Sequence, residues 1–151
     1  MPNSLKARIN DDMKTALRAG DRPRLGTIRL MLAAINQREI DTRTELNDAE
    51  VVAILDKMVK QRRESIAQYQ SARRGDLVAA EQFELDLILS YMPAALSDEE
   101  VARLIDASLT ESDASSLRDM GKVMRLIKPQ LQGRADMAAV SARVKTRLSG
   151  R

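Results

Sequence analysis

Apolar residues recur every three or four positions along almost the whole chain, which is the spacing of one buried face of an α-helix. No convincing alternation of apolar and polar residues, the pattern of a half-buried strand, interrupts it. The first segment has steps of four: Leu5, Ile9, Met13 and Leu17. Asn3 or Ser4 can cap this helix, and Gly20 can end it with a left-handed residue. The pattern predicts an all-α protein.

Helix-start signals divide the next part of the chain. A second helix opens at Pro23 and runs to a loop at residues 41–47. Asn47 can then accept a hydrogen bond from the amide of Glu50 while the Glu50 side chain reaches back, which is a capping box. This signature predicts the start of a long third helix, over about residues 48–73.

Gly75 is expected to end the third helix, and a fourth helix then runs from Asp76 until Pro93 stops the pattern. Ser97 and Glu100 form a second capping box, so a new unit begins there. We therefore expect an N-terminal four-helix unit over residues 1–93 and a C-terminal three-helix unit over residues 94–151, with helices at about 98–110, 117–128 and 137–148.

Charge is distributed unevenly in the second unit. The whole chain has a formal net charge of +3. The segment from Leu117 to Arg151 holds nine basic and two acidic residues, a local charge of +7. A segment with so few acids predicts a basic module whose natural partner is a polyanion.

The sixth helix is expected to separate its apolar and basic residues. Lys122 and Arg125 fall on a different side from the apolar stripe, whose members are Met120, Val123, Met124 and Ile127. Gly121 within this helix costs about 1 kcal/mol relative to alanine unless a closely packed backbone or a ligand compensates. Pro129 is expected to end the regular helix.

The tetrapeptide GRAD, residues 133–136, is typical of a helix entry. Gly133 can take the positive φ of a turn, and Asp136 can cap the last helix. Arg134 then lies beside free helix amides, where it can help to bind a phosphate. Pairing with an acid of the neighbouring helix explains Arg134 equally well.

A basic surface with seven candidate contacts follows from these assignments. The nucleic-acid-binding candidates are Lys122, Arg125, Lys128, Arg134, Arg143, Lys145 and Arg147, with Gly121, Gly133 and Asp136 as motif residues. Proteins that bind single-stranded nucleic acid usually stack its bases on aromatic side chains. This chain has no aromatic residue after Tyr91. We therefore expect contacts with the backbone of a structured nucleic acid.

Composition restricts the chemistry. The chain contains no cysteine, histidine or tryptophan, so the commonest acid, base and metal ligand near neutral pH is absent. No phosphate-binding glycine loop or Ser-x-x-Lys arrangement occurs. We expect no catalytic residue, no cofactor and no metal. No apolar run is long enough for a membrane span or a signal peptide, which favours a protein that is not exported and is located in the cytoplasm.

Five sequence blocks carry a family resemblance. They are VKQRRESIAQY, FELDLILSYMP, LSDEE, DMGKVM and GRAD. Together they resemble the pattern of the GatB/YqeY family over essentially the whole chain. That family is named for its similarity to the tail domain of the B subunit of the tRNA-dependent amidotransferase. The related motif of that tail has a glycine, a Val-Met pair and then Gly-Lys-Ala-Asn, and the residues that would occupy its positions here are Gly121, Val123, Met124, Gly133, Arg134, Ala135 and Asp136.

The resemblance implies a helical protein of two subdomains that holds tRNA. It also implies an association with carbon–nitrogen ligase activity that uses glutamine as amido-N-donor. An aminoacyl-tRNA synthetase or an amidotransferase subunit is the implied protein partner. Family members often have glycine where this chain has Arg125 and Met137. These side chains can obstruct a close approach of RNA, or Arg125 can add a phosphate contact.

The leading hypothesis is an accessory tRNA-binding module that serves tRNA-dependent amidation or aminoacylation. Two alternatives are open: a helical adaptor that binds another protein through its N-terminal helices without binding RNA, and a non-catalytic component of a carbon–nitrogen ligase.

Overall fold

The computed structural model describes residues 4–150, which form seven α-helices and one 3₁₀ turn with no strand among them. The prediction of an all-α protein is confirmed. The chain divides into two compact units, the first ending at Met92 and the second beginning at Pro93. Helices α1 to α4 belong to unit 1, and helices α5 to α7 belong to unit 2.

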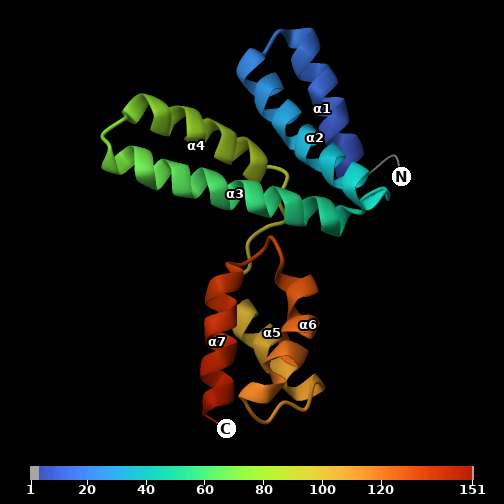
Figure 1. Cartoon of the computed structure of the whole chain (residues 1–151), viewed down its shortest axis with the longest axis vertical. Helices are drawn as coiled ribbons and strands as arrows, with labels where there is room; N and C mark the ends of the chain where they lie inside the picture. Colours follow the sequence, from blue (N-terminus) through green and yellow to red (C-terminus); the bar gives the residue numbers. More distant parts are fainter. Residues whose placement is uncertain (1–3, 151) are drawn as a thin grey trace. The chain divides into compact units, whose positions relative to one another are not determined.

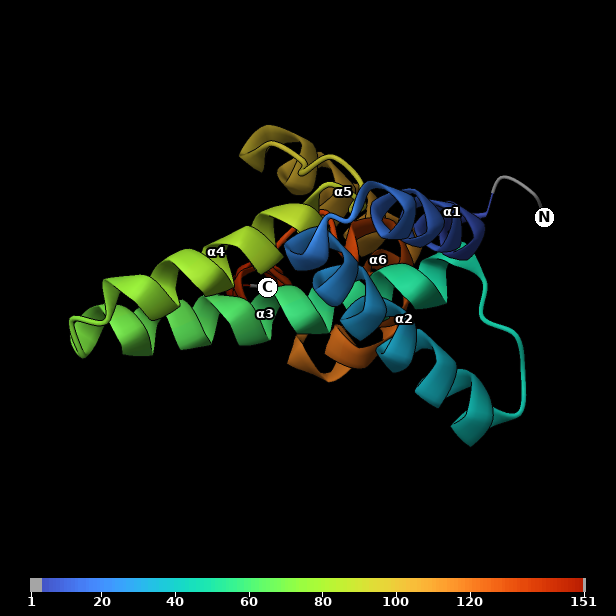
Figure 2. The same cartoon turned by 90° about the horizontal axis from the view of Figure 1, so that it is seen from above.

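Helices α1 (Leu5–Ala19) and α2 (Arg22–Thr42) form a hairpin. Ser4 caps α1 by accepting a hydrogen bond from the amide of Ala7 at 3.1 Å, while Asn3 lies outside the described residues. Gly20 has φ of 69°, as expected for the residue that ends α1. The short turn then leads directly into α2, so the two helices lie side by side in opposite directions (Figures 1 and 2).

Helices α3 (Asp48–Ser71) and α4 (Gly75–Leu89) form a second hairpin. The predicted capping box of Asn47 and Glu50 is present at the start of α3. The sequence predicted that Gly75 ends α3, but Gly75 is the first residue of α4. Arg73 takes the left-handed position of the turn instead, with φ of 57°. Non-glycine residues adopt this region at a modest cost, which a glycine-based rule does not anticipate.

The core of unit 1 lies between these two hairpins. Its completely buried members come from all four helices: Ile9, Ile28, Met31, Ile35, Val51, Leu55 and Ile88. Leu17 was expected in this core but is 56% exposed, and Ala16 is buried in its place. The last turn of α1 therefore faces the core with a small side chain, which allows the chain to reverse closely at Gly20.

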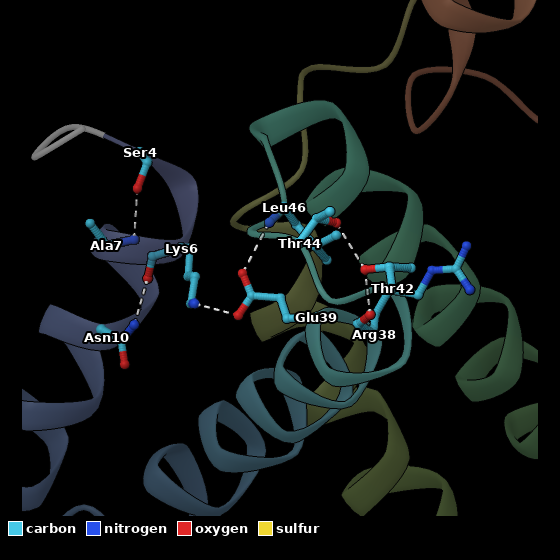
Figure 3. A network of polar contacts seen from close by, with 9 residues as sticks. All are labelled: Ser4, Lys6, Ala7, Asn10, Arg38, Glu39, Thr42, Thr44 and Leu46. Carbon is cyan, nitrogen blue, oxygen red and sulfur yellow. Dashed lines mark hydrogen bonds and ion pairs between the residues drawn. The ribbon is translucent and has the colours of Figure 1, made fainter.

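A polar network connects the start of α1 to the end of α2 (Figure 3). Lys6 donates a hydrogen bond to Glu39, whose second carboxylate oxygen accepts from the amide of Leu46 at 3.0 Å. These two donors hold the pKa of Glu39 below its usual range. The amide of Leu5 donates to Asp48 at 2.9 Å, which brings the start of α3 to the same place.

Unit 2 has its own core, formed by α5 (Asp98–Glu111), α6 (Met120–Leu131) and α7 (Met137–Ser149). The predicted capping box of Ser97 and Glu100 starts α5. The completely buried side chains are Val123, Ile127, Leu131 and Val144. Pro129 was expected to end the regular helix, but it lies within the last turns of α6. Because its neighbours Ile127 and Leu131 are both buried, packing of the helix offsets the hydrogen bond that proline cannot donate.

Across residues 4–150 no helix combines the length and the apolarity needed to cross a bilayer.

Candidate nucleic-acid interface

Helix α6 presents three cations on the side opposite the core of unit 2. Lys122, Arg125 and Lys128 are all exposed, whereas Val123 and Ile127 are completely buried. Residues three apart on a helix lie on neighbouring parts of one face, so the three cations form a continuous strip. The helix contains no carboxylate between Met120 and Leu131. We call these three residues the α6 basic face.

The acid nearest to this face is engaged in a turn. Asp119 accepts hydrogen bonds from the amides of Ser115 at 2.8 Å and Ser116 at 3.3 Å. These backbone donors, helped by the charge of Lys122, hold the pKa of Asp119 below its usual range. The carboxylate is thus ionised and fixed at the entry of α6, and it makes no ion pair with the α6 basic face.

Gly121 has no packing role within its unit. Its position on α6 is exposed, and a Cβ atom built there would meet no described atom within 4 Å beyond its chain neighbours and the adjoining helix backbone. The sequence analysis left two explanations for this glycine, a closely packed backbone and a ligand. The first explanation is wrong for residues 4–150, because no neighbouring backbone packs closely against Gly121. The helix backbone beside Lys122 is instead open to solvent.

The GRAD turn holds the chain that enters unit 2. Gly133 has the expected positive φ, 78°. The Nε atom of Arg134 donates to the carbonyl of Ala94 at 3.2 Å, and the Arg134 carbonyl accepts from the amide of Leu96 at 2.9 Å.

Arg134 takes part in none of the ion pairs found among residues 4–150. Hydrogen bonds from Ser97, helped by the charges of Arg103 and Arg134, hold the pKa of Glu100 at the start of α5 below its usual range. Arg134 therefore still interacts electrostatically with an acid of the neighbouring helix.

Asp136 performs the predicted capping role. It is the N-cap of α7, and its side chain accepts a hydrogen bond from the amide of Ala138 at 3.0 Å. The amides at the start of α7 are therefore occupied in part by a side chain of the protein. This lowers the value of the turn as a phosphate-binding site.

The three candidates on α7 do not share one surface. Arg143 donates to the carbonyl of Asp98 at 3.4 Å, and Arg147 forms an ion pair with Asp106, so both turn toward α5. Lys145 lies midway between them in sequence and therefore points to another side of the helix. Lys145 is exposed and makes none of the ion pairs found among residues 4–150.

The seven candidates thus separate into groups. The structure brings Lys122, Arg125 and Lys128 together, whereas Arg134, Arg143 and Arg147 make contacts within unit 2. A sequence count cannot see this difference, because it depends on which carbonyls and carboxylates the folded helices bring near. Arg151, which was counted in the basic module, lies outside the described residues.

A further run of cations lies in unit 1, and the sequence-based prediction did not include it. The segment from Lys14 to Arg29 holds five basic residues and one acid, Asp21. Acidic residues elsewhere in unit 1 offset these five bases, so the net charge of the chain does not show the run. A local charge count, applied to the N-terminal half as it was to the C-terminal half, would have found it. Among the described residues, no group of three or more acidic side chains is arranged to hold a metal ion.

Comparison with known proteins identifies relatives along most of the chain. The sequence model of the family described as "Yqey-like protein" matches residues 6–148. The chain is 43% identical over 108 residues to "Altered inheritance of mitochondria protein 41, mitochondrial" of Eremothecium gossypii, which is 70% of this chain and 59% of the relative. This chain therefore matches less than two thirds of that relative.

Two further relatives have the same name. The protein of Pyrenophora tritici-repentis is 29% identical over 146 residues, covering 95% of this chain and 80% of the relative. The protein of Saccharomyces cerevisiae strain YJM789 is 34% identical over 111 residues, covering 69% of this chain and 60% of the relative.

Proposed function

Because this chain belongs to the family of YqeY-like proteins, we propose that it is an accessory module that binds tRNA. The α6 basic face contacts the phosphodiester backbone of the folded RNA. The module serves tRNA-dependent amidation or aminoacylation, beside an amidotransferase subunit or an aminoacyl-tRNA synthetase. The chain supplies no catalytic residue of its own, and any link to a carbon–nitrogen ligase runs through such a partner.

The observation that carries the proposal is the α6 basic face itself. Three exposed cations follow one another on a helix that contains no carboxylate, and none of them forms an ion pair within residues 4–150. Lysine and arginine that neutralise phosphates release counterions from the nucleic acid, which supplies most of the affinity of sequence-independent binding. The open backbone at Gly121 allows a phosphate or sugar to come close to the helix.

The absence of aromatic residues after Tyr91 supports a backbone contact. A protein that reads unpaired bases needs rings on which those bases stack. Unit 2 contains basic side chains but no aromatic ring. This composition suits a nucleic acid whose bases are already paired and whose phosphates lie on a regular surface. Folded tRNA has these properties, and the family resemblance selects it among structured RNAs.

A charge-reversal experiment tests this function. Fluorescence anisotropy measures the affinity of labelled bulk tRNA for the wild type and for the double variant Lys122→Glu, Arg125→Glu. The matched control is Lys57→Glu, Arg63→Glu, which changes the same net charge at two exposed positions of α3. We expect at least a tenfold loss of affinity for the α6 variant and a small loss for the control. Equal affinities for all three proteins overturn the proposal.

A second candidate function is a helical adaptor that binds another protein. It is favoured by a groove of about 500 Å³ in unit 1, whose lining residues are Ala34, Gln37, Arg38, Asp41, Glu50, Ala53, Ile54, Lys57, Met58 and Gln61. An adaptor retains its protein partner after nuclease treatment and tolerates Lys122→Glu, Arg125→Glu. An RNA-binding module loses its partner under both conditions.

The cytoplasmic location expected from the sequence stays a prediction. The names of the three relatives contain the word mitochondrial, which describes those proteins. Fractionation of cells that express this chain distinguishes the two locations.

A further inference from the structure

The hairpin of α1 and α2 carries a second set of exposed cations, separate from the α6 basic face. Its segment from Lys14 to Arg29 has five basic residues and one acid. That acid, Asp21, is the N-cap of α2 and accepts a hydrogen bond from the amide of Arg24 at 3.3 Å. The carboxylate is therefore used in the turn between the helices, and five bases against one acid leave this segment with a local charge of +4.

Four of these cations point away from the core of unit 1. On α1, Lys14 and Arg18 are one turn apart and exposed. On α2, Arg22 and Arg29 are two turns apart and exposed, while Ile28 is completely buried. Arg18 and Arg22 flank the turn at Gly20, so the four cations are distributed over one hairpin.

One stripe of exposed positions on α2 contains no carboxylate, and the exposed acid of the helix, Asp41, lies beside its C-terminal end. The members of this stripe, at successive helical spacings, are Arg22, Gly26, Arg29, Ala33, Asn36 and Ile40. Arg22 and Arg29 are about 10 Å apart along the helix axis. That distance is a small multiple of the axial spacing between successive phosphates of one strand, which is about 3.4 Å in duplex DNA. Two guanidinium groups at this spacing suit the phosphates of a nucleic-acid backbone.

These four cations form no ion pair with any residue that the structure describes. The ion pairs of unit 1, within the described part of the chain, use Lys6, Lys60, Arg62 and Arg74. None of them uses Lys14, Arg18, Arg22 or Arg29. Their charges are therefore not neutralised within the unit, in contrast to those of Arg143 and Arg147 in unit 2, which turn toward α5.

Gly26 is a second observation that points to a ligand. It lies inside α2, one turn after Arg22 and almost one turn before Arg29, and its position is exposed. A Cβ atom built at Gly26 would meet no described atom within 4 Å beyond its chain neighbours and the adjoining helix backbone, so neither packing nor a turn explains the glycine. Glycine weakens a helix relative to alanine. A bare backbone between two arginines resembles the arrangement at Gly121, beside Lys122 and Arg125.

We propose that the outer surface of the α1–α2 hairpin, with Lys14, Arg18, Arg22 and Arg29 around Gly26, is a second site for the phosphodiester backbone of structured RNA. This inference rests on the proposed function and adds an RNA-binding surface on unit 1 to the one on unit 2. The RNA then contacts two separate basic surfaces of one chain. Each phosphate contact adds to the salt dependence of binding, so both surfaces contribute to one measurable slope.

The test compares two double variants of unit 1 in their binding to bulk tRNA. Arg22→Gln, Arg29→Gln removes two cations from the proposed site, and Lys57→Gln, Arg63→Gln removes two from α3 as the matched control. A third variant, Gly26→Ala, adds a methyl group at the bare backbone. Circular dichroism and thermal unfolding establish that each variant is folded. Anisotropy at several salt concentrations gives affinity and slope.

We expect the slope of log K against log salt to fall in magnitude by about 1.4 to 1.8 for Arg22→Gln, Arg29→Gln, and to stay unchanged for the control. Gly26→Ala should raise the melting temperature and weaken tRNA binding. The inference is overturned if Arg22→Gln, Arg29→Gln keeps the wild-type slope and affinity. It is also overturned if the control Lys57→Gln, Arg63→Gln loses as much affinity and slope as that variant does. In that case, loss of binding by Lys122→Glu, Arg125→Glu still supports the proposed function. If the wild type itself does not bind tRNA, both fail.

Discussion

The hydroxyl group of Tyr91 donates a hydrogen bond to the carboxylate of Asp12, which joins the residues after α4 to the middle of α1. The guanidinium group of Arg8 lies 4.7 Å from the centre of the Tyr91 ring and donates to the carbonyl of Ser90 at 3.2 Å. Tyr91 is only 4% exposed. The last residues of unit 1 are thus fixed against α1, directly before Pro93.

The buried phenol makes the stability of unit 1 sensitive to alkaline pH. Burial and the hydrogen bond to Asp12 raise the pKa of Tyr91 to about 12. The pKa is higher in the folded state than in the unfolded state, where it is about 10. This contribution to stability is therefore complete below pH about 10 and is lost as the pH rises through 12.

The measurement uses the Tyr69→Phe variant, in which Tyr91 is the only tyrosine, and the absence of tryptophan keeps the ultraviolet spectrum simple. Phenolate absorbance should reach half of its change near pH 12, and urea unfolding should show stability declining above pH about 10. Half-titration near pH 10 would show that the Tyr91 hydroxyl is open to water.

Sequence patterns predicted the elements of this fold well where the cause is local. The two capping boxes, the Asp136 cap and the positive φ of Gly133 depend on a few neighbouring residues, and the structure confirms all of them. Leu17 and Gly75 were assigned wrongly, because burial and turn conformation at these positions depend on the other helices of unit 1.

The candidate site was harder to predict for the same reason. Lys122 and Arg125 could be placed on one face from helical spacing alone. The contacts of Arg134 with Ala94 and of Arg147 with Asp106 join residues 40 and 41 positions apart in the sequence. No local pattern contains such information, so the sequence could not show which of the seven candidate bases make contacts within unit 2.

Glu39 should give unit 1 part of its acid sensitivity. Its pKa is lowered by the hydrogen bond from Lys6 and by the amide of Leu46. This contribution to stability is present above the ordinary glutamate pKa of about 4.3 and is lost as the pH falls through the lower folded value. Glu39→Gln should cost about 1 to 2 kcal/mol at neutral pH. The difference from wild type should shrink in acid.

Urea unfolding at a series of pH values measures this difference, with the exposed Glu45→Gln as the control. A cost for Glu39→Gln that is the same at every pH would contradict the account, because the wild-type carboxylate would then not be titrating.

Arg134 should act mainly on the chain that enters unit 2. Removing its side chain in Arg134→Ala abolishes the hydrogen bond to the Ala94 carbonyl. The amide of Leu96, whose acceptor is the Arg134 carbonyl, should then exchange hydrogen several times faster. Affinity for tRNA should fall less than in Lys122→Ala. A fall as large as that of Lys122→Ala, with unchanged exchange at Leu96, would instead make Arg134 a phosphate contact.

Gly121→Ala separates stability from binding. The added methyl group meets no described atom within 4 Å beyond its chain neighbours and the adjoining helix backbone, so the variant should be more stable by about 0.5 to 1 kcal/mol. It should nevertheless bind tRNA several times more weakly, because the methyl group occupies the space that a phosphate or sugar needs. Thermal unfolding and anisotropy measure the two effects in the same samples. A more stable variant with wild-type affinity would leave Gly121 without a binding role.

The most direct test of the central claim is the salt dependence of tRNA binding, measured by anisotropy from about 50 to about 200 mM salt. The wild type and the variant Lys122→Gln, Arg125→Gln, Lys128→Gln are compared. We expect a steep negative slope for the wild type and a slope smaller in magnitude by about 2 to 3 for the variant, since each lost phosphate contact removes about 0.7 to 0.9. Identical slopes for the two proteins, or no binding by the wild type at about 50 mM salt, would contradict the claim that the α6 basic face holds RNA.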